Sequence, residues 1–300
     1  MQKISPCIWC DREALEAAEF YVSAFENSSI EYVTHYLEND TSPSGLPAGT
    51  PLTVRFILCG QEFNTLNGGP VFRPNPAISF FVDCESEVQM DLLWNKLSAE
   101  GAVLMEVGEY PFSKRFGWLA DRYGVSWQLS FSGMKQKITP YLMFTENVCG
   151  KAEEAMQFYY GVFEEAKLID IHRYGKDADG AEGTVMFANF RLSGQDFMAA
   201  DSAYPHGFTF NEGISFYVYC RDQAEIDTFW NNLTDGGEEQ PCGWLKDRFG
   251  VSWQIIPEDI ERLGDSDDPA RSGRVNAALM KMKKIDLGVL QAAYDGSKSV

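Results

Sequence analysis

An internal repeat is the feature that most constrains what this chain can fold into. The stretch "GWLADRYGVSWQLS" at 117–130 returns as "GWLKDRFGVSWQII" at 243–256, and "ISFFVDC" at 78–84 returns as "ISFYVYC" at 214–220. The two motifs keep the same order in both halves, at separations of 126 and 136 residues. Self-similarity of this kind is typical of a duplicated structural unit. The sequence therefore predicts two copies of one unit that differ in the lengths of their loops.

The repeat divides the 300 residues into three regions. A first unit covers 1–133 and a second unit covers 137–257, joined through the polar stretch "FSGMKQK" at 131–137. Residues 258–300 have no counterpart after the first unit, and their segments "DDPARSGRVNAALMKMKK" and "DLGVLQAAYDG" predict short helices with one apolar side. We expect this helical C-terminal tail to pack on the sheets or on a partner chain.

Periodicity within each unit alternates between that of strands and that of helices. Apolar residues recur at helical spacing over 12–26, and Asp222 with Glu225 form a capping box ahead of another helix. Short runs that are rich in Ile, Val, Phe and Trp and bounded by Gly or Pro predict strands at 4–10, 52–59, 77–83 and 124–131. Each unit has the order strand–helix–three strands, followed by strand–helix–two or three strands, so the sequence predicts an α+β fold of paired βαβββ modules.

Composition excludes several classes of partner. The formal net charge is −19, and a surface that binds nucleic acid needs a basic footprint. The N-terminal residues do not form a signal peptide, and no apolar run approaches the ~18–20 residues of a membrane span. Seven cysteines in a chain of this size favour reduced thiols. We therefore expect a cytoplasmic protein whose partners include neither nucleic acid nor membrane.

The stretch "CIWC" at 7–10 has the cysteine spacing of redox centres and zinc half-sites. Side chains at positions i and i+3 of a strand point to opposite faces, so Cys7 and Cys10 cannot close on each other or on one ion. The second copy has "YLMF" at 141–144, without cysteine. The sequence therefore predicts that both thiols serve packing.

The duplication carries motifs of a known family. With "EEAMQFYYGVF", "GQDFMAAD" and "CGWLKDRFGVSWQIIP", the chain resembles the PhnB-like branch of the glyoxalase, or vicinal oxygen chelate, superfamily, a branch also described as a 3-demethylubiquinone-9 3-methyltransferase domain. The resemblance covers both units and implies sheets that curl around cups, where relatives often hold a divalent metal through His and Glu. Single-unit members typically pair as homodimers, so the resemblance also implies an intramolecular pseudo-dimer with two cups and leaves a further homodimer possible.

Strand alternation predicts which side chains face the cups. Where the superfamily places His or Glu, this chain has Ser, Thr and Gln, and its three histidines, His35, His172 and His206, lie elsewhere. We therefore predict no metal site and no cofactor. The predicted ligand-binding residues are the following side chains of the inner face: Trp9, Ser79, Phe81, Gln128, Tyr141, Ser215, Tyr217 and Gln254.

Two functions remain open from the sequence. The first is a protein that binds a small molecule in cup-shaped sites without the usual metal ligands. The alternative is a metal-dependent lyase or dioxygenase of the superfamily with atypical ligands. A Rossmann-type methyltransferase needs a glycine-rich loop between a strand and a helix, and none is present, so no motif supports methyl transfer. The catalytic residues, the ligand and the question whether the chain is an enzyme stay open.

Overall fold

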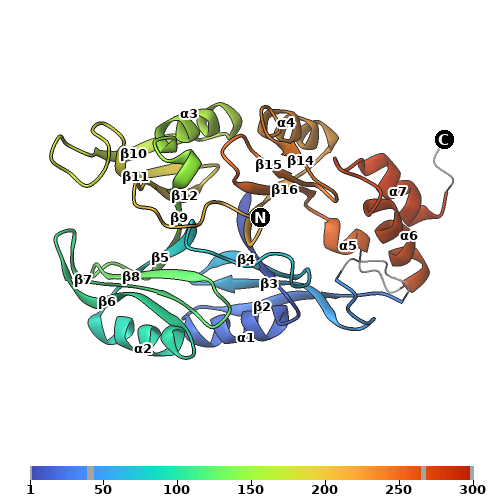
Figure 1. Ribbon diagram of the computed structural model, residues 1–300. Coiled ribbons are helices and arrows are strands. Elements are labelled where there is room, and N and C mark those ends of the chain that lie inside the picture. The colour runs from blue at the N-terminus through green and yellow to red at the C-terminus, as the bar shows by residue number, and fades with distance from the viewer. Residues whose placement is uncertain (1, 39–43, 265–267, 298–300) are drawn as a thin grey trace.

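A computed structural model describes residues 2–38, 44–264 and 268–297 of the chain. The parts of the predicted regions 1–133 and 258–300 that fall in the gaps lie outside the described residues. The fold is α+β, with four βαβββ modules and C-terminal helices, as the repeat predicts (Figure 1).

The first unit contains two modules. The elements of module 1 are β1 (Ile4–Cys10), α1 (Ala14–Ala24), β2 (Ser29–His35), β3 (Pro51–Leu58) and β4 (Gln61–Asn67). The elements of module 2 are β5 (Ile78–Cys84), α2 (Glu87–Ser98), β6 (Ala102–Tyr110), β7 (Ser113–Ala120) and β8 (Ser126–Phe131). Ser86 caps α2 by accepting a hydrogen bond from the Gln89 backbone N–H.

The second unit repeats this order. The elements of module 3 are β9 (Lys137–Phe144), the 3-10 turn η1 (Glu146–Val148), α3 (Ala152–Val162), β10 (Lys167–Arg173), β11 (Val185–Leu192) and β12 (Gln195–Asp201). The elements of module 4 are β13 (Ile214–Cys220), α4 (Gln223–Leu233), β14 (Glu238–Glu239), β15 (Trp244–Lys246) and β16 (Ser252–Pro257). Asp222 caps α4 by accepting a hydrogen bond from the Glu225 backbone N–H, as the capping motif predicts.

The two units exchange modules to build two eight-stranded sheets. Sheet A runs β14-β15-β16-β13-β1-β4-β3-β2 and joins module 1 to module 4. Sheet B runs β10-β11-β12-β9-β5-β8-β7-β6 and joins module 3 to module 2. The joins are antiparallel: Cys7 of β1 lies opposite Ser215 of β13, and Ser79 of β5 lies opposite Tyr141 of β9. Each sheet therefore has one half from each unit.

The helices cover the faces of the sheets where the two modules of one unit meet. Figure 1 shows α1 beside α2 along one side of the molecule and α3 beside α4 along the other. Between the helices and strands of the first unit lies an aromatic core in which Phe80 packs at 5.2 Å from both Phe63 and Trp127. Phe216 of the second unit packs at 5.3 Å from Phe197 and Trp253 in the same way. Apolar cores thus join modules within a unit, whereas the sheets join modules between units.

A buried carboxylate lies at the centre of each of these cores. Asp121, in the turn between β7 and β8, accepts hydrogen bonds from Tyr21 Oη at 2.7 Å and from Trp127 Nε1 at 2.8 Å. It also accepts from the backbone N–H groups of Tyr123 and Val125. Burial raises the pKa of Asp121 to about 6, and these four donors oppose the rise. The carboxylate therefore satisfies the turn and ties α1 of module 1 to module 2.

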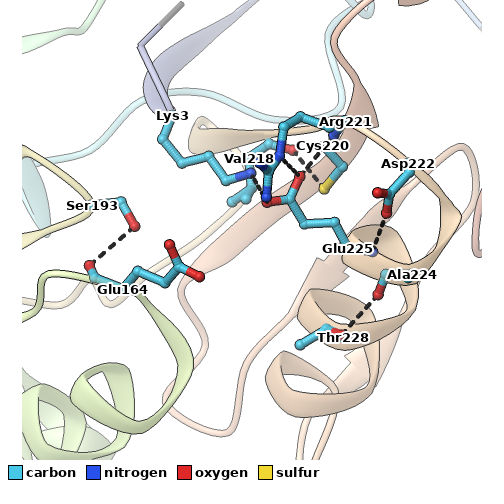
Figure 2. A network of polar contacts seen from close by, with 10 residues as sticks. All are labelled: Lys3, Glu164, Ser193, Val218, Cys220, Arg221, Asp222, Ala224, Glu225 and Thr228. Carbon is cyan, nitrogen blue, oxygen red and sulfur yellow. Dashed lines mark hydrogen bonds and ion pairs between the residues drawn. The ribbon is translucent and has the colours of Figure 1, made fainter.

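The N-terminal strand is fastened to the second unit by an ion pair. Figure 2 shows Lys3, just before β1, reaching the Glu225 carboxylate at the start of α4, with Arg221 on the same carboxylate. The Lys3 ammonium also lies 5.1 Å from the centre of the Phe229 ring. Half-buried groups of opposite charge thus reinforce the junction of β1 with β13.

The C-terminal tail contains three helices, α5 (Ile260–Gly264), α6 (Pro269–Leu279) and α7 (Leu287–Asp295). Asp268 caps α6 and Asp286 caps α7 through their side chains. The tail lies on the side of the molecule that holds sheet A (Figure 1). Among the described helices, none has the length and apolar character that crossing a bilayer requires.

Candidate ligand-binding site

A cavity of about 670 Å³ lies over the face of sheet A that carries Trp9, Tyr217 and Gln254. We call it the sheet A cavity. Trp9 comes from β1 of the first unit, and Tyr217 and Gln254 come from β13 and β16 of the second. Because β1 pairs with β13, and β13 with β16, the exchange of modules brings these three side chains onto one face.

The structure divides the eight residues predicted from the sequence between the two sheets. Four belong to sheet A: Trp9, Tyr217 and Gln254 line the cavity, and Ser215 lies behind Gln254, whose side-chain Nε2 donates to Ser215 Oγ at 2.9 Å. The other four, Ser79, Phe81, Gln128 and Tyr141, lie on sheet B. Gln128 donates to Ser79 at 2.8 Å, so both sheets contain the same Gln–Ser pair.

The Trp9 side chain is held in place by four neighbours. Its Nε1 donates to the Gly69 carbonyl at 2.7 Å, and the Phe72 ring meets it edge-on at 5.0 Å. Its ring lies on Gly68, where a Cβ atom would come within 2.1 Å of the indole. Trp244 meets it on another side at 5.7 Å with an interplanar angle of 75°. Trp9 is therefore a fixed aromatic wall of the cavity.

Several lining residues were missed by reasoning from the sequence. Asn64 and Leu66 line the cavity from β4, and Tyr219 lines it from β13. Alternation along these strands could have found them, because Asn64 and Leu66 are alternate residues of β4, as Tyr217 and Tyr219 are of β13. Four glutamates also line the cavity, and none of them lies on a strand that was predicted to face it: Glu212, Glu238, Glu239 and Glu261.

The tail borders the cavity. Ile260 of α5, Val275 and Leu279 of α6, and Ile285 line it. Glu261 of α5 pairs with Arg55 of β3 at 3.1 Å, so the tail that follows the second unit is joined to a strand of the first. Of the two expected roles of the tail, packing on the sheets or on a partner chain, the first agrees with these positions, and Val275 and Ile285 belong to the buried core.

The two sheets differ at the hairpin that precedes their last strand. In sheet B, β6 and β7 have 9 and 8 residues, and Phe116 of this hairpin stacks on Phe81. In sheet A, the corresponding β14 and β15 have 2 and 3 residues. The shorter hairpin of sheet A leaves space that the tail helices border, and this is where the cavity lies.

Buried titratable groups of the site are held in their neutral forms. Burial raises the pKa of the Cys7 thiol to about 12, against the opposing effect of hydrogen bonds with Tyr217, Gln254 and Ser215. Burial and the neighbouring Cys7 raise the pKa of Tyr217. The Cys7 thiol is therefore a poor nucleophile and a poor metal ligand. Cys10 lies instead on the helix side of β1, near Glu13 and Asp121, in agreement with strand alternation.

The residues of the cavity do not fit a metal site. In residues 2–38, 44–264 and 268–297, no group of three or more His, Cys, Asp or Glu side chains is arranged to hold an ion. His35 lies at the end of β2 and lines the cavity, His172 lies on β10, and His206 Nε2 contacts Ser202 Oγ at 2.7 Å. Serine, tyrosine and glutamine oxygens on the inner strands are weak ligands for Zn²⁺ or Mn²⁺.

Comparisons with known proteins agree with the repeat and with the fold. A family model described as 3-demethylubiquinone-9 3-methyltransferase matches twice, over residues 2–130 and 136–256. The PhnB protein from Bacillus cereus is 42% identical over 44% of this chain and 100% of its own, with a TM-score of 0.41. Glyoxalase I from Zea mays is 12% identical over 84% of this chain and 92% of its own, with a TM-score of 0.52, which shows the shared fold. No curated protein matches the sequence.

Proposed function

The chain belongs to the 3-demethylubiquinone-9 3-methyltransferase family, the PhnB-like branch of the vicinal oxygen chelate superfamily, and from this premise we propose that it binds a small organic molecule in the sheet A cavity without a metal. The sheet A cavity is the observation that carries the proposal. Its volume of about 670 Å³ falls within the range of ligand sites, ~300–1,000 Å³. Its aromatic and aliphatic walls would bury an apolar body, and a few polar groups would orient it.

The lining supports binding more than chemistry at a metal. Gln254, Asn64 and Tyr219 supply neutral hydrogen-bonding groups, and the Cys7 thiol behind them stays protonated. Methyl transfer is not part of the proposal, because no glycine-rich loop follows a strand to hold a nucleotide-like cofactor. The formal charge of −19 supports a small molecule over nucleic acid as the partner.

The units at 1–133 and 137–257 and the tail at 258–300 act together in this proposal. The first unit supplies Trp9, the second supplies Gln254, and the tail supplies Leu279. We infer that one chain forms a complete binding site as an intramolecular pseudo-dimer, without a second copy.

The test is to purify the untagged full chain, determine its metal content, and identify by mass spectrometry any organic molecule released on gentle denaturation. We expect a small molecule near one per chain and metals well below that level. Trp9→Ala should lose the molecule, whereas Met143→Ala, the equivalent position in sheet B, should keep it. A divalent metal near one per chain would overturn the proposal in favour of a metal-dependent lyase or dioxygenase. Absence of any retained molecule, together with no shift in melting temperature across a metabolite library, would also overturn it.

A further inference from the structure

We propose that the sheet A cavity is selective for an amphipathic cation, a molecule with an aromatic or aliphatic body and a protonated amine or quaternary nitrogen. This inference rests on the proposed function and adds the class of ligand. Three features support it: the aromatic wall, the charges of the lining, and the position of Trp244, which differs from that of its counterpart in sheet B.

The aromatic wall has the arrangement that attracts a cation. The rings of Trp9, Phe72 and Trp244 are in edge contact, with Trp9 in the middle and interplanar angles of 84° and 75°. All three side chains border the cavity. A cation within ~6 Å of a ring face is attracted by the ring quadrupole, and tryptophan is the strongest such partner.

The charged side chains of the lining are acidic. Glu212, Glu238, Glu239 and Glu261 border the cavity, and among the described residues no Lys or Arg does so. Glu212 pairs with Lys246 at 2.8 Å and Glu261 with Arg55 at 3.1 Å, while Lys283 lies 3.6 Å from Glu239. Glu238 forms no ion pair within the described part of the chain. The cavity therefore presents more negative than positive charge, and the net charge of −19 adds a field of the same sign.

The repeat itself reveals that Trp244 is placed differently from its counterpart in sheet B. In sheet B, Trp118 Nε1 donates to Ser126 Oγ at 2.7 Å. The equivalent residues of sheet A are Trp244 and Ser252, and they do not make this bond, because Trp244 lies against Trp9 instead. Ser252 Oγ is buried and has no hydrogen-bond partner among the described residues. A buried polar atom without a partner is costly, and Ser252 shares its face of β16 with Gln254, which lines the cavity.

These features specify different parts of one ligand. The rings and the aliphatic tail residues accept the apolar body, and the carboxylates with the ring faces accept the positive nitrogen. An anion of the same shape would meet Glu238 and Glu239 and be repelled.

A matched trio of probes tests the inference on the full chain. Each probe has a phenyl group on a four-carbon chain. At neutral pH 4-phenylbutylamine is positively charged, 4-phenylbutan-1-ol is neutral and 4-phenylbutanoate is negatively charged. Their dissociation constants are measured by calorimetry and by the tryptophan fluorescence of the protein. We expect the amine to bind at least tenfold more tightly than the alcohol, and the carboxylate to bind most weakly.

Variants locate the effect. Glu238→Gln with Glu239→Gln should weaken the amine at least threefold and leave the alcohol unchanged, since glutamine keeps the oxygen that accepts from Trp230 Nε1. Glu164→Gln with Glu165→Gln, an exposed acidic pair that does not line the cavity, should leave both probes unchanged.

The outcomes separate the inference from the proposed function. If the alcohol or the carboxylate binds as tightly as the amine and Trp9→Ala abolishes that binding, the cavity binds small molecules but is not selective for cations. If none of the three probes binds, the inference is overturned, and the extraction experiment still decides the proposed function. An equal loss of amine binding in the two acidic-pair variants would likewise overturn it, because the effect would then be one of overall charge.

Discussion

Tyr21 of α1 donates a 2.7 Å hydrogen bond to the buried carboxylate of Asp121, which belongs to the other module of its unit. Tyr159 makes the same bond to Asp247, also at 2.7 Å. The two bonds occupy equivalent places in the two aromatic cores. They connect modules that belong to different sheets, so they couple sheet A to sheet B through the interior.

Removing one of these hydroxyl groups should destabilise the protein. Tyr21→Phe leaves a carboxylate oxygen with one donor fewer, and we expect a loss of about 1–3 kcal/mol in the free energy of unfolding, measured with denaturant. Tyr159→Phe should cost a similar amount, and the double variant should cost the sum, because the residues share no partner. Tyr204→Phe is the control, since that side chain is exposed. Losses below 0.5 kcal/mol in both single variants would contradict a coupling role for the two bonds.

The stability of the protein should depend on pH through the ionisation of Asp121. Its pKa in the folded state is raised to about 6, above the ~3.9 of an unfolded aspartate. The stability that this shift contributes is fully present below the unfolded pKa and is lost as the pH rises through about 6. The wild type should therefore gain on the order of 2 kcal/mol relative to Asp121→Asn between about pH 7.5 and about pH 4.5. A difference that is flat, or that moves in the opposite direction, would contradict the raised pKa.

The two glutamines that pair with serine should respond differently to the same substitution. Gln254 lines the cavity and Gln128 lies on sheet B. We expect Gln254→Leu to weaken binding of the retained molecule by about tenfold, the loss of one or two hydrogen bonds. Gln128→Leu should change the melting temperature without changing the affinity. A large fall in stability with unchanged affinity in Gln254→Leu would assign that residue to structure alone.

Gly68 should be required for the aromatic wall. A Cβ atom there would lie 2.1 Å from the Trp9 indole, so Gly68→Ala must displace the ring that forms the wall. We expect a loss of 4-phenylbutylamine binding and a stability cost of about 1–3 kcal/mol from overpacking. Gly161→Ala within α3 is the matched control, because no atom lies within 4 Å of its added Cβ, and it should leave binding intact. Normal binding by Gly68→Ala would show that Trp9 is dispensable.

Cleavage of the chain between the units should not separate them. Met134 is exposed in the join, so a protease site introduced there should be cut readily. Because each sheet contains strands of both units, we expect the two fragments to elute together on a sizing column until denaturant is added. Clean separation of two folded halves under native conditions would contradict the exchange of modules.

Much of the fold and part of the site could be predicted from local sequence patterns. The duplicated motifs established the βαβββ order, and alternation along β1, β13 and β16 identified Trp9, Tyr217 and Gln254 as inner residues. Alternation is a property of the single strand, so the same side chains share a face whichever strand lies beside it. Alternation does not predict which strand will be the neighbour in the sheet. Ser79 and Ser215 are equivalent in the repeat, and the residues around each of them do not predict which one shares a sheet with Trp9.

The features that distinguish the two sheets depend on contacts distant in sequence. Trp118 and Trp244 occur in nearly identical motifs, yet only Trp118 bonds to its serine. The neighbour decides the difference: Trp244 has Trp9 beside it, and the residue of the second copy that corresponds to Trp9 is Met143. The contribution of the tail to the cavity is equally non-local, since α6 must lie beside a sheet that also contains β1 to β4 of the first unit.

Fusing two units and adding a single tail breaks the twofold equivalence that a homodimer of single units must obey. A symmetric dimer presents every site twice, and any substitution alters both copies at once. In the described part of this chain the tail helices border the cavity of sheet A, while the long hairpin of β6 and β7 forms one edge of sheet B. Under the proposed function, selection can therefore act on sheet A for binding and on sheet B for stability, and a binding isotherm should show one class of site instead of two interacting ones.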